Sequence, residues 1–189
     1  MPTTAQSSHA SPAKARILEA SMLLFARRPL SETSLRDIAA EAQVDVAYVH
    51  RAFGSKAEIF RQALNAVAPL DEIFAHPADP DSVIERLAEQ AFLRDPLRVE
   101  DVEPLHLIIR SCVCSEARSI LDGFIEASLA RPLADSFGHE DLGRAMFAVS
   151  ILSGFATMRL VVGNSTLRSM PRDTLKTMLT KALHEAMSA

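Results

Sequence analysis

The chain has 189 residues, of which 48% are hydrophobic and 23% are charged. This length corresponds to one large domain or two small ones, and this composition excludes a fibrous protein and excludes disorder for most of the chain. Aromatic residues make up only 5%, with no Trp and one Tyr, and Gly numbers six, whereas Ala, Leu and Met are abundant. Such a mixture favours helices over strands, so an all-α fold is expected.

The net charge of -4 is unevenly distributed along the chain. Residues 1–66 hold eight Lys and Arg against six acidic residues, a net charge of +2, and residues 67–189 hold twelve against eighteen, a net charge of -6. A polyanion should therefore prefer the N-terminal part.

The N-terminal residues MPTTAQSSHASPAKA lack the apolar segment of a signal peptide, and residues 1–11 are expected to form a disordered arm. The most apolar window, 145–158, contains several polar residues and falls short of the ~20 apolar residues that a membrane span needs. Cys112 and Cys114 are too close in sequence for a disulfide framework and are interpreted as packing residues rather than redox sensors. A cytoplasmic protein is expected.

Capping signals divide residues 12–67 into four helices. Each helix follows a Ser or Asp whose side chain can accept a hydrogen bond from a free backbone N–H, and two of these residues have an acidic partner three positions later, as in a capping box. The caps are Ser11, Ser34, Asp45 and Ser55, and the helices run over about 12–27, 34–41, 46–52 and 56–67.

Three prolines in twelve residues, Pro69, Pro77 and Pro80, predict a linker over residues 68–80. Apolar periodicity predicts a second, helical domain over residues 81–189, and no strand pattern competes with it. The helices expected there run over about 81–94, 101–114, 116–137, 140–163 and 171–187.

The two short helices between residues 34 and 52 are joined by a tight turn, which is the pattern of a helix-turn-helix. Apolar side chains on both would hold the pair against the first helix, so the helix over 46–52 would lie exposed and could enter a DNA major groove about 12 Å wide. These apolar residues are Leu35, Ile38, Ala42, Val44, Val49 and Phe53.

The segment ARILEASMLLFARRPLSETSLRDIAAEAQVDVAYVHRAFGSKAEIF, about a quarter of the chain, resembles the DNA-binding region of the TetR family of bacterial transcriptional regulators. The resemblance rests on the order of its motifs: ILxA before LF, then T-S-x-R-D-I-A, A-x-V, a Phe that closes the recognition helix, and S-K-x-E. The acidic, helical remainder has the length usual in this family and no motif of its own.

The resemblance implies DNA contacts from the start of the second helix, from the recognition helix and from the lysine that opens the fourth helix. The chemistry agrees, because hydroxyl groups, lysines and helix N-termini bind phosphate and arginine pairs with guanine. Tyr48 either contacts DNA or packs as a half-buried aromatic residue, and His50 has the same two alternatives, a DNA contact or a packing role. The expected contact residues are Thr33, Ser34, Arg36, Val46, Ala47, Tyr48, His50, Arg51 and Lys56.

Two positions depart from the family pattern. Gln43 stands where the turn usually has Gly, and a left-handed backbone there costs ~1–2 kcal/mol. His50 stands where the recognition helix frequently has Tyr, and Tyr48 replaces a smaller residue. The operator sequence of a relative therefore cannot be transferred to this chain.

The helix expected over 140–163 is apolar on nearly all sides, and the helix over 171–187 carries one apolar stripe. We expect a homodimer through a four-helix bundle of these two helices, the alternative being a core helix within one chain. A dimer would present two recognition helices one DNA turn, ~34 Å, apart to a palindrome. The interface residues expected are Gly143, Phe147, Gly154, Ala156, Leu175, Met178, Leu179, Ala182 and Leu183.

The resemblance further implies a small-molecule pocket in the C-terminal domain, whose occupancy changes the spacing of the two DNA-binding units. His106 and Arg110 lie one helical turn apart and are either its polar anchors or an exposed pair near Glu103. The lining residues expected are Phe92, His106, Arg110, Phe124, Met146, Phe147, Phe155 and Met158.

The sequence thus predicts a ligand-responsive DNA-binding transcriptional regulator that binds a palindromic operator as a homodimer and is released by a small-molecule effector. A repressor is expected because most members of the family that it resembles are repressors. The alternative is a dimeric helical small-molecule-binding protein that has lost specific DNA binding. No glycine-rich phosphate loop, G-x-S-x-G motif or paired metal-ligand spacing is present, so no enzyme, cofactor or metal site is expected.

Overall fold

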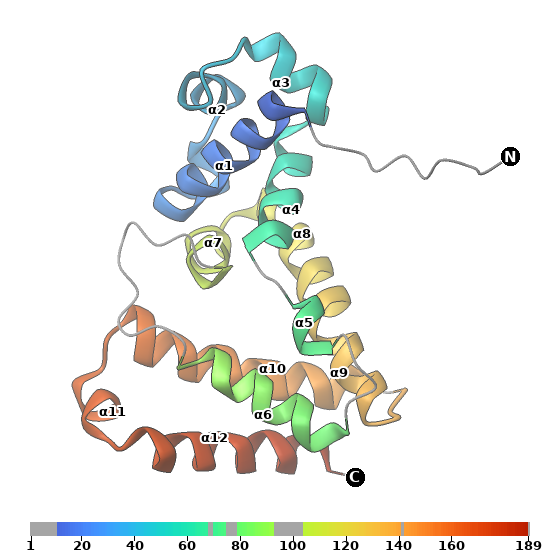
Figure 1. Cartoon of the computed structure of the whole chain (residues 1–189), viewed down its shortest axis with the longest axis vertical. Coiled ribbons are helices and arrows are strands. Elements are labelled where there is room, and N and C mark those ends of the chain that lie inside the picture. Colours follow the sequence, from blue (N-terminus) through green and yellow to red (C-terminus); the bar gives the residue numbers. More distant parts are fainter. Residues whose placement is uncertain (1–10, 68–69, 75–78, 93–103, 141, 189) are drawn as a thin grey trace, which may run out of the picture.

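The computed structural model describes residues 11–67, 70–74, 79–92, 104–140 and 142–188, and over these residues it contains helices and no strand. The expected all-α fold is confirmed. The N-terminal helices form one end of an elongated molecule, and the longest C-terminal helices lie across the other end (Figure 1).

The four N-terminal helices start at the caps that the sequence predicts, with one exception. The hydroxyl of Ser34 and the carboxylates of Asp37 and Asp45 accept backbone N–H groups, and Ser55 accepts the N–H of Glu58 at 3.1 Å. Ser11 makes no side-chain cap, so Pro12 alone marks the start of the first helix. The elements are α1 (Pro12–Arg27), the 3-10 turn η1 (Leu30–Glu32), α2 (Leu35–Glu41), α3 (Val46–Phe53) and α4 (Lys56–Val67).

The C-terminal part contains two short helices that the sequence analysis missed, α5 in the expected linker and α11 after the last apolar helix. The elements are α5 (Asp71–Phe74), α6 (Pro80–Gln90), α7 (Pro104–Ser111), α8 (Ser115–Ile125), η2 (Glu126–Ala130), α9 (Arg131–Ser136), α10 (Leu142–Ala156), η3 (Thr157–Val161), α11 (Ser165–Ser169) and α12 (Arg172–Met187).

The helices α8, η2 and α9 form one uninterrupted helical run with a π-helical middle. The Arg131 N–H donates to the carbonyl of Glu126, five residues earlier. Pro132 has no N–H to donate to the carbonyl of Ser128, which removes one α-helical bond at this point and explains the wider turn.

The buried apolar residues form two cores, and this helical run passes from one into the other. The first core lies under α1–α4, where the Phe25 and Phe60 rings meet edge to face at 5.0 Å, and it also takes in Leu107 of α7 and Phe124 of α8. The second core is built from α6, α9, α10 and α12, and Ile125 packs against both. The proline-rich segment therefore separates two parts of the sequence, whereas packing joins α7 and α8 to the N-terminal helices.

The helical run of α10 and η3, from Leu142 to Val161, is 20 residues long and apolar enough to cross a membrane by length and composition. This run extends beyond the apolar window 145–158 at both ends, and 28% of an 18-residue window within it is buried. Its buried side, with Ala145, Ala148 and Val149, packs in the second core against α12 and α9, and its other side is exposed.

Candidate nucleic-acid interface

The turn between α2 and α3 is a helix C-cap of the Schellman type. The N–H of Val44 donates to the carbonyl of Ala39 at 3.0 Å, and the N–H of Gln43 donates to that of Ala40 at 3.2 Å. This motif needs a left-handed residue at the position of Gln43, whose φ is 53°. The left-handed glutamine expected from the sequence is confirmed, and it sets the direction in which α3 leaves the turn.

Helix α3 is anchored by one face and exposed on the other, at the outer end of the molecule (Figure 1). Val49 and Phe53 are buried in the first core, while the Asp45 carboxylate accepts the N–H of Ala47 at 2.6 Å and caps the helix. The exposed residues of α3 are Val46, Ala47, His50 and Arg51.

Tyr48 combines a packing role with an accessible polar end. Its ring is half-buried and packs against the first core, as in the packing alternative, and its hydroxyl lies 3.3 Å from the hydroxyl of Ser11. The guanidinium of Arg51 lies over the ring at 5.8 Å. This cation–π contact limits the positions that the exposed Arg51 can adopt.

Two exposed polar residues stand at the start of α2. The Asp37 carboxylate accepts the N–H of Ser34 at 2.8 Å and its hydroxyl at 2.7 Å, and these two hydrogen bonds lower the pKa of Asp37 below its ordinary value. Arg36 is exposed on the same turn. The Ser34 hydroxyl therefore caps α2, and Arg36 keeps an exposed side chain at this edge.

Thr33 is not available for a DNA contact through its side chain, contrary to the sequence-based expectation. The residue is 1% exposed, and its hydroxyl donates to the carbonyl of Pro29 at 3.2 Å. It closes the loop after α1, and the neighbouring Ser34 takes the surface position.

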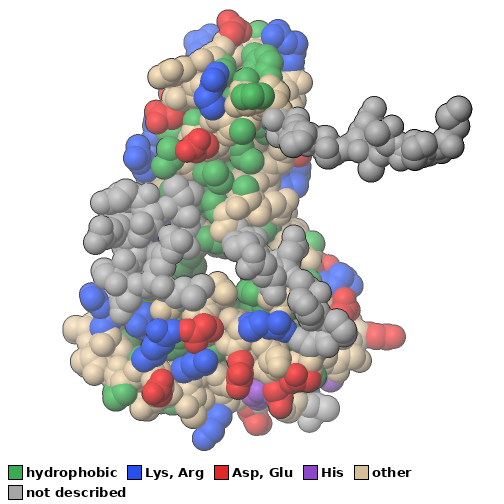
Figure 2. Space-filling model, viewed as in Figure 1, with side chains coloured by type: hydrophobic (Ala, Val, Ile, Leu, Met, Phe, Trp, Pro, Cys, Tyr) green, Lys and Arg blue, Asp and Glu red, His purple; other side chains and the backbone are tan. Residues whose placement is uncertain are grey.

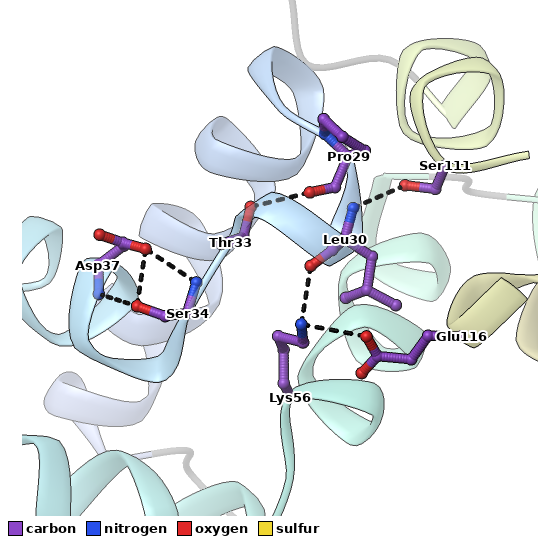
Figure 3. A network of polar contacts seen from close by, with 8 residues as sticks. All are labelled: Pro29, Leu30, Thr33, Ser34, Asp37, Lys56, Ser111 and Glu116. Atoms are coloured by element: carbon purple, nitrogen blue, oxygen red, sulfur yellow. Dashed lines mark hydrogen bonds and ion pairs between the residues drawn. The ribbon is translucent and has the colours of Figure 1, made fainter. Parts of the chain in front are cut away.

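Lys56 already has protein partners, which the sequence analysis did not foresee (Figure 3). Its ammonium donates to the carbonyl of Leu30 at 2.8 Å and lies 3.1 Å from the carboxylate of Glu116. Within the chain, the Glu116 carboxylate therefore supplies a negative charge beside Lys56, and the phosphate contact expected for this lysine stays a prediction. Ser111 accepts the N–H of Leu30 at 3.2 Å and fixes the same loop from α7.

Sequence reasoning missed one further cation near α3. The ammonium of Lys14, in the first turn of α1, lies over the Phe53 ring at 5.1 Å. Figure 2 shows Lys and Arg side chains at the α2–α3 end, while most of the acidic side chains visible in this view lie over the C-terminal part. The difference in net charge between the N-terminal and C-terminal parts of the sequence thus also separates the two ends of the molecule.

The expected dimer residues divide into an exposed group and a buried group. Leu175, Leu179 and Leu183 are at most 4% exposed and pack in the chain's own second core, so their assignment to a dimer interface is wrong. Phe147 and Met178 are 62% and 56% exposed. Gly143 and Gly154 are also exposed, and Ala156 and Ala182 are half-buried.

The expected pocket residues do not form one site. Phe124 belongs to the first core, whereas Phe92 packs against Phe155 in the second core at 5.6 Å. Phe147 and Met158 are exposed and line no interior pocket, and Arg110 is exposed on α7. Met146 is partly buried against the second core, and His106 is half-buried.

A cleft of about 350 Å³ lies instead between α4 and the α8–η2 run. Phe124 is the only expected pocket residue on its wall. The cleft is lined by Arg61, Asn65, Ser119, Ile120, Gly123, Phe124, Ala127 and Ser128.

The two cysteines lie near the end of α7. Cys112 is exposed, so its interpretation as a packing residue is wrong, and Cys114 is half-buried before α8. Desolvation raises the pKa of the Cys114 thiol, but hydrogen bonds with the Ala117 backbone and Ser31 outweigh it and lower the pKa overall.

The buried anchoring of α3 and the all-helical remainder define a helix-turn-helix protein with a separate C-terminal helical part. Residues 17–63 match the family model for bacterial regulatory proteins of the tetR family, and residues 81–186 match the model for the tetracyclin repressor-like C-terminal domain. The chain belongs to the TetR family.

Similar proteins agree with this assignment. The HTH-type transcriptional repressor SCO4008 of Streptomyces coelicolor is 35% identical over 79 residues, which cover 40% of this chain and 41% of that protein. The crystal structure of the TetR-family regulator SCO0857, from Streptomyces coelicolor, has a TM-score of 0.66 and 26% identity over 98% of this chain and 100% of that chain. The multidrug binding protein EbrR, solved with ethidium, has a TM-score of 0.64 and 20% identity over 94% of this chain and 99% of that chain.

Proposed function

We propose that this protein is a cytoplasmic transcriptional regulator, acting as a repressor, that binds a palindromic DNA operator as a homodimer. The observation that carries the proposal is the exposed face of α3, with Val46, Ala47, His50 and Arg51 on a capped helix whose opposite face is buried. Ser34, Arg36 and the hydroxyl of Tyr48 extend this face, and Arg51 is the candidate for reading guanine.

The dimer is supported by an exposed apolar face on α10, η3 and α12. Phe147, Met158, Val161 and Met178 belong to it, with Gly154 in the same row along α10. Exposed apolar patches of this kind mark interfaces with other protein chains. Two weakly basic DNA-binding units held together would reach an affinity that one unit lacks.

The effector response is supported by the cleft between α4 and α8. Because α4 ends the DNA-binding unit and α8 leads into the second core, a ligand in the cleft would favour one relative position of the two parts. EbrR, solved with ethidium, is an example of a similarly folded protein with a small molecule bound.

Fluorescence anisotropy with duplex DNA from upstream of the protein's own gene tests the proposal. We expect sequence-preferred binding at moderate salt, which Arg51→Ala weakens about 5- to 150-fold while relaxing base preference at one position. Arg118→Ala, an exposed arginine on α8, serves as the control and leaves binding unchanged. Binding without sequence preference would favour instead a helical ligand-binding protein that has lost its operator.

Light scattering tests the dimer. Gly154→Arg places a charge in the apolar face and should halve the measured mass, whereas Gly123→Arg should not, although a Cβ meets nothing within 4 Å at either position. A dimer mass for Gly154→Arg would place the interface elsewhere.

A compound screen for release of labelled operator DNA tests the effector site. Gly123→Phe fills the cleft, so compounds that release the wild-type protein should fail on this variant. Full release of the variant would exclude the cleft as the effector site.

A further inference from the structure

We propose that Glu116 is a positioning residue that competes with DNA phosphate for Lys56, so that the position of α8 sets part of the DNA affinity. This inference rests on the proposed DNA-binding function. It goes beyond that function by naming the intramolecular group that holds the lysine when DNA is absent.

The Lys56 side chain is held from two sides. The Leu30 carbonyl, in the loop after α1, accepts its ammonium at 2.8 Å, and the Glu116 carboxylate lies 3.1 Å away on α8 (Figure 3). The loop itself is fixed, because the buried hydroxyl of Ser111 accepts the Leu30 N–H. The ammonium therefore has a defined place between the DNA-binding unit and the C-terminal part.

The ion pair between Lys56 and Glu116 is accessible to solvent. The Lys56 side chain is 21% exposed, and the Glu116 side chain is 45% exposed, so both can be reached by a solvated polyanion. An ammonium has three N–H donors, of which these two contacts use two, and the third can still point outward. A phosphate that approaches Lys56 meets the nearby carboxylate, which offsets the attraction that the lysine exerts.

Glu116 belongs to a helical run that reaches the C-terminal part. It lies in the first turn of α8, where the helix dipole favours a carboxylate. The same helical run continues through η2 into the second core. A shift of α8 would therefore change the distance between Glu116 and Lys56, and by linkage DNA binding would favour the α8 position that releases the lysine.

A double-mutant cycle on Glu116→Gln and Lys56→Gln tests this inference. Binding is measured by anisotropy on a 20-base-pair duplex of unrelated sequence over a range of salt concentrations, because a phosphate contact needs no particular bases. Glu116→Gln should tighten binding about 1.5- to 5-fold, the effect of an exposed ion pair. It should also steepen the salt dependence by up to ~0.9 in log–log slope, the effect of one more phosphate contact.

Two comparisons make the result specific. In the Lys56→Gln background, Glu116→Gln should no longer change affinity beyond the effect of net charge. The matched control Glu126→Gln measures the effect of net charge on affinity. Glu126 lies on the same helical run, is 47% exposed and pairs with Arg131 rather than Lys56.

The outcomes separate this inference from the proposed function. Equal affinities and slopes for Glu116→Gln and Glu126→Gln would overturn the competition, even if the wild-type protein binds its operator. So would weaker binding by Glu116→Gln, which would indicate that the ion pair only supports packing. A wild-type protein that binds no DNA at low salt would overturn the proposed function and this inference together.

Discussion

Replacing Gln43 by glycine should stabilise the protein, because the turn between α2 and α3 holds a side chain in a backbone region that disfavours one. Its φ of 53° is required by the two backbone hydrogen bonds that Gln43 and Val44 donate to α2. The residue is exposed, so its side chain loses no buried contact on removal.

The magnitude follows from two opposing terms. A left-handed non-glycine residue costs ~1–2 kcal/mol, which Gln43→Gly removes. Glycine adds backbone freedom to the unfolded chain, which costs roughly 0.5–1 kcal/mol. The net gain should be about 0.5–1 kcal/mol, or a rise of about 1–4 °C in Tm for a chain of this length.

Urea and thermal unfolding followed by circular dichroism measure this gain, with Gln43→Ala as the control. Alanine keeps the Cβ and hence the left-handed penalty, so it should not stabilise the protein. Equal midpoints for Gln43→Gly and Gln43→Ala would refute the reasoning, since the gain would then not come from the backbone conformation.

Four further substitutions test the fold and the expected dimer interface. Asp37→Ala should lower the urea midpoint more at pH 7 than at pH 3. Hydrogen bonds from Ser34 lower the folded pKa of Asp37, so the contribution of its carboxylate is fully present above the ordinary carboxyl pKa and declines as the pH falls toward the lowered value. An equal loss at both pH values would contradict this. Leu183→Ala should lower the free energy of unfolding by about 2–5 kcal/mol because Leu183 is buried. Met178→Ala should act only through dimer dissociation, so the loss of stability that it causes should depend on protein concentration. A loss that is independent of concentration would argue against a place for Met178 in the interface. Ser111→Ala leaves the buried N–H of Leu30 without its acceptor and should cost about 1–3 kcal/mol by the same unfolding assay, and an unchanged midpoint would mean that the loop finds another partner.

The helices of the DNA-binding unit and the left-handed turn between α2 and α3 could be predicted from signals close together in the sequence. Ser34, Asp45 and Ser55 cap backbone groups within three positions of themselves, and the left-handed Gln43 stands where the family pattern has Gly. These are local interactions, so a sequence carries them without knowledge of the rest of the chain. The amphipathic face of α3 follows in the same way from the spacing of Val49 and Phe53.

The partners that these helices contact could not be predicted in this way. The Leu30 N–H donates a hydrogen bond to Ser111, 81 positions away, and Lys56 forms an ion pair with Glu116 of another helix. No local pattern therefore shows whether a lysine already has an acidic partner within the chain. The apolar stripe of α12 likewise fits an internal core and a dimer interface equally well. In the structure, α12 packs against α6 and α10, so Leu175, Leu179 and Leu183 are buried and Met178 is exposed. Periodicity fixes which side chains share a helix face, but the neighbours that cover that face are fixed by packing among residues distant in sequence.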